Sequence, residues 1–287
     1  MKISTEIGST SAFVGMEKAV ELVAAAGFDC WDFSMFGMAT YDWSKKERVF
    51  RGDPLERRDT ALKLAQTLRK TGESLGITCN QSHAPFPVSC GPVRECLPLA
   101  LECTAEAGGK ICVIHPDNNK NAAENAAMYR ELLPLAHKYG VMIATENMWN
   151  WDNVKDQASP AACSDAKSFA EHIDIVNDPF LVACVDVGHA EMKGLGTSAA
   201  GMITELGSRV KALHLHDNDK WHDNHALPFT AKIDYAPVIA ALRQTGYSGE
   251  FTLETNLATV ERADVLDGLK KMSAAARRLA GMFCSQT

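Results

Sequence analysis

Short apolar runs that each end in a histidine or an acidic residue recur along this chain of 287 residues. Six of them read as β-strands because they are brief, apolar and rich in β-branched residues. They are ITCNQSH, ICVIH, VMIATE, LVACVD, VKALHLH and FTLE. Their polar ends are 30 to 40 residues apart, about the length of a βα unit, and are His83, His115, Glu146, Asp186, His216 and Glu254.

Amphipathic helical patterns alternate with these strands from end to end, without a linker or a low-complexity segment. Two more strands are expected at residues 3–7 and 28–34. Helices are expected at residues 16–26, 54–75, 92–107, 122–139 and 260–282, and from about residues 164, 198 and 235. Eight strands and eight helices predict an α/β fold, a (β/α)8 TIM barrel in a single domain over residues 1–287. The strand ends would then meet at one mouth, where such barrels place their chemistry.

The bulk properties exclude few functions but favour some. The net charge of -7 gives no overall attraction to nucleic acid or to an anionic membrane surface. Nine scattered cysteines, without a CxxC pair, indicate reduced thiols. The first residues lack the apolar stretch of a signal peptide, and no run approaches the length of a membrane span, so we expect a cytoplasmic protein.

Glu146, Asp186, His216 and Glu254 form the strongest candidate metal site, because carboxylates gathered at one barrel mouth repel each other unless a cation joins them. Mixed nitrogen and oxygen ligands suit Mn²⁺, Zn²⁺, Co²⁺ or Fe²⁺ better than Ca²⁺. We expect Mn²⁺ or Zn²⁺ as the cofactor, with Co²⁺ or Mg²⁺ as alternatives. Further candidates would allow a second or third metal, or would contact the substrate instead. They are His83, His115, His189, Asp223 and His225.

Other polar and aromatic residues carry plainer expectations. His137 and His172 lie on expected helices and are interpreted as surface groups. His214 shares the strand face of His216 and is expected to be a core or hydrogen-bonding histidine. Aromatic residues of the loops either wall the site or pack the loops; they are Phe36, Phe86, Trp149, Trp151 and Trp221.

Several motifs of this sequence resemble those of the xylose isomerase-like TIM-barrel superfamily, a sugar phosphate isomerase/epimerase group related to endonuclease IV. The motifs are VIHP, ATEN, CVDVGHAEMKG, ALHLHDND, HDNH, IDYAPVIAALRQTGYSGE and FTLE, and they span essentially the whole chain. The resemblance to ketose 3-epimerases implies one metal ion, Mn²⁺ or a related ion, on Glu146, Asp186, His216 and Glu254. It also implies that His189 contacts the substrate.

The resemblance to endonuclease IV implies a different site, with three zinc ions. All nine of its ligand positions have a counterpart here: His83, His115, Glu146, Asp186, His189, His216, Asp223, His225 and Glu254. Three features depart from these relatives. The chain has Asp-Val-Gly-His at the sixth strand where the resemblance implies Asp-Thr-Cys-His, and Pro-Phe-Thr-Ala at 228–231 where sugar-isomerase relatives have Pro-Gly-x-Gly. It also lacks an insertion rich in arginine and aromatic residues that would wedge into DNA.

We therefore expect a divalent-metal-dependent sugar isomerase or epimerase that acts on a ketose, an aldose or a related hydroxy-carbonyl through an enediolate. Glu146 and Glu254 would move the proton, and His189 would hold a substrate oxygen. The alternative is a zinc phosphodiesterase that acts at abasic sites in DNA, and a non-catalytic barrel is a third class. The expected partner is a small sugar rather than nucleic acid or a membrane. No glycine-rich phosphate cradle follows the last two strands, which favours an unphosphorylated sugar, and a homo-oligomer is left open.

Overall fold

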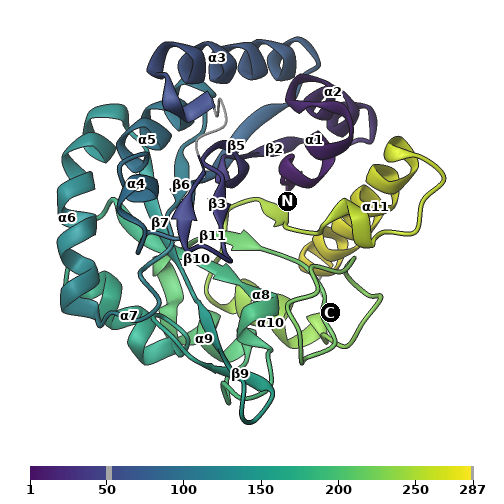
Figure 1. Cartoon of the computed structure of the whole chain (residues 1–287). Coiled ribbons are helices and arrows are strands. Elements are labelled where there is room, and N and C mark those ends of the chain that lie inside the picture. The colour runs from purple at the N-terminus through teal and green to yellow at the C-terminus, as the bar shows by residue number, and fades with distance from the viewer. Residues whose placement is uncertain (50–53, 286–287) are drawn as a thin grey trace.

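Eight parallel strands close into a barrel in the computed structural model, which describes residues 1–49 and 54–285 (Figure 1). In chain order the barrel strands are β1 (Ile3–Thr5), β2 (Cys30–Ser34), β5 (Thr78–His83), β6 (Ile111–Val113), β7 (Met142–Glu146), β10 (Leu181–Asp186), β11 (Val210–His214) and β12 (Phe251–Leu253). Six form one sheet in the order β11-β10-β7-β6-β5-β2, and β1 pairs with β12. Single bridges, Glu6 to Asp32 and Leu215 to Leu253, join this pair to the sheet on either side. The predicted (β/α)8 barrel is confirmed.

The helices lie outside the strands, as Figure 1 shows for α3, α6 and α11. Their bounds are α1 (Gly8–Val14), α2 (Met16–Ala25), α3 (Arg58–Ser74), α4 (Gly91–Arg94), α5 (Leu97–Glu106), α6 (Ala122–Tyr139), α7 (Ala166–Asp174), α8 (Val187–Ala190), α9 (Ala199–Leu206), α10 (Tyr235–Gln244) and α11 (Val265–Cys284). Short 3-10 turns occur at Phe36–Met38, Pro54–Glu56, Gly207–Arg209 and Leu257–Thr259. Within the described residues, no helix is both long and apolar enough to cross a membrane.

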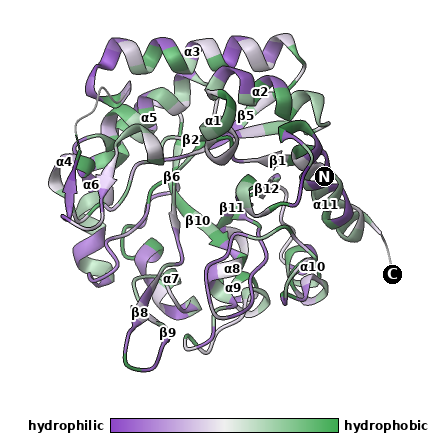
Figure 2. Ribbon diagram, turned by 45° about the vertical axis from the view of Figure 1, so that its right-hand side comes forward, coloured by the Kyte–Doolittle hydropathy of each residue, from purple (hydrophilic) through white to green (hydrophobic). Residues whose placement is uncertain are grey.

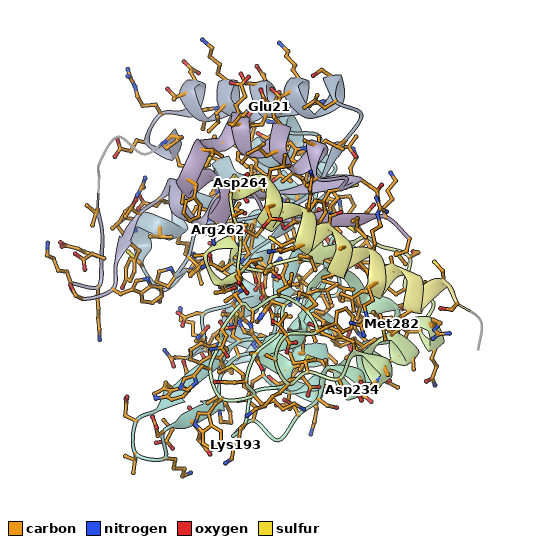
Figure 3. All side chains as sticks on the ribbon, turned by 90° about the vertical axis from the view of Figure 1, so that its right-hand side faces the viewer. Glu21, Lys193, Asp234, Arg262, Asp264 and Met282 are labelled. Carbon is orange, nitrogen blue, oxygen red and sulfur yellow. The ribbon has the colours of Figure 1, made fainter. Side chains whose placement is uncertain are left out.

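Local sequence signals explain most helix boundaries. Asn121 caps α6 in a capping box with Glu124, and Gly140 ends this helix with φ at 65°. Asp264 caps α11 by accepting a hydrogen bond from the backbone N of Asp267, so this helix starts five residues later than expected, and Figure 3 shows it running from there towards Met282.

Two helix predictions need correction. The single helix expected at 92–107 is two helices, α4 and α5, because Pro98 has no N–H and its ring would clash with the carbonyl of Arg94, the last residue of α4. A helix before residue 16, α1, was not predicted. Gly15 separates it from α2 with φ at 81°, a value that glycine adopts at no steric cost.

Buried side chains fall into two layers, one between strands and helices and one inside the barrel. The inner layer combines a small apolar cluster around Val113, Val182 and Cys184 with a polar floor. In this floor Gln81 donates to Asp32 at 2.9 Å and accepts from Thr252 at 3.2 Å. Packed apolar side chains and hydrogen-bonded polar side chains thus line the barrel interior below the mouth.

Two antiparallel hairpins stand on the loops at the C-terminal ends of the strands, and neither was predicted. They are β3–β4 (Tyr41–Asp42 and Glu47–Arg48) and β8–β9 (Trp149–Asp152 and Gln157–Pro160). Both turns are built alike. Asp42 accepts from the backbone N of Ser44 and Lys45, and Asp152 accepts from those of Val154 and Lys155. Figure 2 shows β8–β9 projecting away from the barrel.

Two helical histidines differ in their environment. His137 is exposed and bonds Asp178 at 2.9 Å, as a surface residue would. His172 was expected at the surface but is buried, with Nδ1 bonded to the Ser168 carbonyl and Nε2 to Asn125. It can be buried because both ring nitrogens have partners, Ser168 in its own helix α7 and Asn125 in α6.

Candidate active site

All six polar strand ends from the sequence lie at the C-terminal mouth of the barrel. His83, Glu146 and Asp186 are the last residues of β5, β7 and β10. His115, His216 and Glu254 follow β6, β11 and β12 by one or two residues. Parallel strands with sequential order place all their carboxyl ends on one side, so residues up to 171 positions apart share this pocket (254 − 83).

An inner group consists of Glu146, Asp186, His214 and Glu254, whose potential ligand atoms lie within 4.8 Å of one another. His214 Nδ1 is 3.2 Å from Glu146 Oε2 and 3.4 Å from Glu254 Oε2. Both carboxylate oxygens of Glu146 are buried without a partner in hydrogen-bonding geometry. Buried carboxylates in this state are costly unless something else satisfies them.

His214 joins the inner group, although the sequence indicated a core or hydrogen-bonding role for it. The register explains its position, because Asp186 on β10 lies directly beside His214 on β11. His216 has the same side-chain direction but lies two residues farther along, about 6.5 Å nearer the mouth. It still contacts Asp186, with Nε2 3.1 Å from both carboxylate oxygens.

An outer group consists of His189, His216, Asp223 and His225. Asp223 Oδ2 is 3.2 Å from His189 Nε2 and 3.1 Å from His225 Nε2, and its Oδ1 is 3.6 Å from His216 Nε2. The ring of His216 stacks on that of His225, with centroids 4.1 Å apart. Three imidazole nitrogens and one carboxylate thus point at a common centre.

Each histidine of the outer group uses its other ring nitrogen to bond a backbone carbonyl. His189 Nδ1 bonds the Asn147 carbonyl at 2.9 Å, and His225 Nδ1 bonds that of Glu254 at 2.7 Å. His216 Nδ1 makes a longer contact, 3.4 Å, with the carbonyl of Asp217. This is how metal-binding histidines are usually held, since the bond at Nδ1 fixes the tautomer that leaves Nε2 free to ligate.

Gly188 in α8 makes room for the outer group. A Cβ at this position would overlap Cε1 of His216 and lie 2.5 Å and 2.7 Å from the two ring nitrogens. Any other residue would therefore displace the ring.

The remaining predicted ligands form a histidine pair, His83 and His115, whose Nε2 atoms are 2.9 Å apart. His115 Nε2 is 3.3 Å from Glu146 Oε2, so the pair adjoins the inner group. Phe86 stacks on His115 with centroids 4.7 Å apart and covers the pair. The structure therefore brings together all nine residues that the sequence singled out, and adds His214.

Burial and neighbouring charges separate the acidities of the carboxyl groups. Burial raises the pKa of Glu254 to about 8, against the lowering effect of His214 and His225. Burial also acts to raise the pKa of Asp186, but His189 and His216 outweigh it and lower this pKa to about 2. The pKa of Glu146 lies well below its ordinary value, because His214 and His115 overcome the effect of burial. Glu146 is fully buried, whereas 13% of the Glu254 side chain is exposed.

A cavity of about 620 Å³ opens above these residues. His83, His115, Glu146, His189 and Glu254 line its inner end. Of the five aromatic residues expected as walls, Phe86, Trp149 and Trp151 line it. Phe36 lies edge-on to His83, and Trp221 instead donates to the Asp156 carbonyl under the Lys193 amine.

Tyr41 and Trp43 also line the cavity and were not predicted as walls. The repeated hairpin turn could have located them. In both YDWSKK and WDNVKD, an aspartate is followed three residues later by a lysine and then by a residue with positive φ, Lys46 or Asp156.

Residues 20–278 match the family model of the xylose isomerase-like TIM barrel. The chain belongs to this family. An uncharacterized protein of Methanocaldococcus jannaschii is 26% identical over 190 residues, which are 60% of this chain and 62% of that protein. Another, from Sinorhizobium fredii, is 29% identical over 89 residues, 31% of this chain and 28% of that protein. The chain thus covers less than two thirds of either of these curated relatives.

Solved structures resemble this xylose isomerase-like barrel over nearly its whole length. A D-tagatose 3-epimerase-like protein is 20% identical with a TM-score of 0.72, covering 99% of this chain and 98% of that one. The 3-keto-D-glucoside 4-epimerase of E. coli is 14% identical with a TM-score of 0.69, covering 97% and 99%. The IolI protein, solved with a zinc atom, is 15% identical with a TM-score of 0.74, and each chain covers the other fully. At these identities the likeness shows the fold.

Proposed function

We propose that this chain is a divalent-metal-dependent sugar isomerase or epimerase. The observation that carries the proposal is the inner group, in which two glutamates, an aspartate and a histidine surround one point at the end of a ligand-sized cavity. The names of the structural neighbours, epimerases of D-tagatose, D-allulose, L-ribulose and 3-keto-D-glucosides, support a sugar as the substrate. None of the nine cysteines, all of which lie within the described residues, forms a disulfide, and this supports a cytoplasmic location because reduced thiols are usual there.

The residues fit a divalent cation. Both carboxylate oxygens of Glu146, Nδ1 of His214 and Oδ1 of Asp223 are buried without hydrogen-bond partners. Cations bound at the inner and the outer group would satisfy these atoms and offset the repulsion among the carboxylates. Glu146, Asp186, His214 and Glu254 would hold a Mn²⁺ or Zn²⁺ ion, with His216 in contact with Asp186. The outer group would hold a second ion, and His83 with His115 and Glu146 would offer ligands for a third.

When bound, the ion would supply Lewis-acid polarisation of a substrate carbonyl. The proton transfers belong to the chain. Glu146 and Glu254 approach the same point from β7 and β12, so one carboxylate removes the proton from the carbon next to the carbonyl and the other returns one. Return to the opposite face inverts that carbon, whereas return to the neighbouring carbon gives an isomer. His189 Nε2 is placed to hold a substrate oxygen when it does not ligate a metal.

The test uses the metal-loaded protein in D₂O with D-tagatose, D-fructose, L-ribulose and a 3-keto-D-glucoside. Proton transfer through a carboxylate would exchange the C–H next to the carbonyl for deuterium, which NMR detects whatever the product. Glu146→Gln or Glu254→Gln should lower this rate at least about 100-fold with little change in KM. Glu205→Gln, an exposed change on α9, is the control. A Glu254→Gln protein with full activity and full metal content would refute the assignment.

One observation favours a second function, a metal-dependent phosphodiesterase for abasic DNA. All nine residues that match endonuclease IV lie in this one mouth. Several metal ions could generate hydroxide and neutralise a phosphate. The net charge of -7 opposes binding to a DNA backbone. Salt-sensitive nicking of an abasic duplex by the zinc-loaded protein, absent in Asp223→Asn, would favour this function over the first.

A further inference from the structure

Two rows of aromatic side chains lead from the inner end of the cavity to solvent. On one side Phe86 stacks on His115, Trp43 lies 6.3 Å from Phe86, and Tyr41 meets Trp43 edge-on at 4.9 Å. On the other side Trp149 lies 6.3 Å from His189, and Trp151 lies 6.2 Å from Trp149. One row belongs to the β3–β4 hairpin and the β5 loop, and the other to the β8–β9 hairpin.

The Trp149–Trp151 row is held in place by amide side chains. Asn118 donates to the carbonyl of Trp149 at 3.0 Å and to Asn150 Oδ1 at 3.3 Å. Asn150 in turn donates to Asn119 Oδ1 at 3.2 Å. These bonds tie the hairpin to the loop after β6, so its aromatic wall is formed before any ligand arrives.

Trp43 is 64% exposed, yet it lines the cavity and lies beside the rings of Tyr41 and Phe86. A large apolar surface left in water at the edge of a ligand cavity usually marks a binding surface. The cavity volume of about 620 Å³ lies in the range of pockets that hold drug-sized ligands, about 300–1,000 Å³. A single monosaccharide is much smaller than a drug-sized ligand. A sugar at the inner group would leave the aromatic part of the cavity empty.

The lining outside the proposed metal ligands does not favour a phosphate. Asp117 brings a carboxylate to the cavity, and Lys46 is the one lysine or arginine among its described lining residues. Lys46 is exposed at the tip of the β3–β4 hairpin. Phosphate sites are usually built from arginine forks, lysines or clustered backbone N–H groups.

We propose that the substrate is a neutral glycoside whose sugar ring carries a ketone, with that ring at the inner group and a second ring between the two aromatic rows. The glycosidic bond would lie where the histidine-lined inner end of the cavity meets its tryptophan-lined outer part. This inference rests on the proposed function for the inner, sugar-binding half. The outer half follows from the aromatic rows and the lining charges.

The experiment measures binding rather than turnover, by ligand-observed NMR titration of the metal-loaded protein. The probes are phenyl and methyl β-glycosides of D-glucose, D-galactose and D-xylose, with glucose 6-phosphate as the anionic probe. Stacking should make the best phenyl glycoside bind about tenfold more tightly than its methyl counterpart. Trp43→Ala and Trp151→Ala should each reduce this preference several-fold. Phe13→Ala, which truncates a half-exposed aromatic residue outside the cavity lining, should leave it unchanged.

Equal affinity for methyl and phenyl glycosides would overturn the proposal, and so would a preference that survives the combined Trp43→Ala and Trp151→Ala change. Tighter binding of glucose 6-phosphate, or no binding by any phenyl glycoside at about 10 mM, where a weak carbohydrate complex would still be seen, would do the same. The outcome is separable from the proposed function. Absence of hydrogen exchange with every sugar would refute the isomerase while leaving a measured phenyl preference intact.

Discussion

Gly188→Ala should disrupt the outer group, because the added methyl group would occupy the place of the His216 ring. Overpacking of a buried site costs about 1–3 kcal/mol. Loss of the buried hydrogen bonds between His216 and Asp186 adds about 1.5–3 kcal/mol, because charged partners are involved. The better helix propensity of alanine returns about 1 kcal/mol. The net destabilisation is therefore about 1.5–5 kcal/mol.

The ring has little room to move away from the new methyl group. On one side the ring stacks on that of His225, with centroids 4.1 Å apart. The backbone of His216 is also held, because the preceding residue, Leu215, forms a β-bridge with Leu253 of β12. We therefore expect the ring to leave Asp186 and Asp223 rather than shift by a fraction of an ångström. We therefore expect the proposed metal binding by the outer group to be lost with it.

Urea denaturation of metal-free protein measures the stability change, and mass spectrometry of the reconstituted protein measures metal per chain. Gly281→Ala is the matched control, because this glycine lies in α11 and a Cβ there meets nothing within 4 Å. The control should gain up to about 1 kcal/mol. If Gly188→Ala unfolds at the same urea concentration as Gly281→Ala and binds as much metal, the account of the His216 ring is wrong.

Three further predictions concern His214 in the inner group, the bound metal, and the ion pair between Asp29 and Arg277. His214→Asn should weaken metal binding at least about 10-fold, as measured by competition with a chelator. His137→Asn, a change on the surface, is the control and should leave metal binding unchanged. Equal losses of affinity in the two variants would argue against His214 as a ligand. Treatment with EDTA should abolish activity and lower Tm, since a cation at 100 times its Kd stabilises the fold by about 2.7 kcal/mol, and an unchanged Tm would mean that no cation is held. Asp29→Asn should cost about 1 kcal/mol near pH 7, because Asp29 pairs with Arg277 at 2.7 and 2.8 Å. Burial acts to raise the pKa of Asp29, but the bonds from Arg277 and the backbone N of Ile3 lower it on balance, so this stability is present above the unfolded pKa of about 3.9 and is lost as pH falls through the lower folded value. Denaturation at several pH values should therefore show a constant gap from wild type above about pH 5 that narrows below about pH 4, and a gap that widens in acid would contradict this.

The barrel and the convergence of the site could be predicted because both depend on patterns of the sequence. Short apolar strands at regular spacing specify a parallel barrel, and the barrel brings the strand ends together whatever the details of packing. The helix Ala122–Tyr139 was placed correctly because Asn121 and Gly140 mark its two ends. The helix at 92–107 was not, because the effect of Pro98 depends on where the preceding turn lies.

The sequence could not show which histidine of LHLH belongs to the inner group. His214 and His216 are two residues apart, so their side chains point the same way, and the alternation of side chains along a strand does not distinguish them. Only the register with β10, which sets His214 beside Asp186, assigns them to different layers. The aromatic rows escaped prediction for a similar reason, since the distance from Trp43 to Phe86 depends on how a hairpin folds over a neighbouring loop.

The residues of the inner group stand on parts of the barrel that differ in how many hydrogen bonds join neighbouring strands. Glu146, Asp186 and His214 end strands of the continuous six-stranded sheet, whereas Glu254 follows β12, which pairs with β1 and meets the sheet through an isolated bridge at Leu215. Segments with few shared hydrogen bonds open at lower free energy than the rest of a fold, and their amides exchange with solvent sooner. The β1–β12 ribbon is thus the less firmly bonded side of the mouth. Because Glu254 follows this ribbon and Glu146 ends a strand of the continuous sheet, the distance between their carboxylates depends on how the ribbon seats against that sheet.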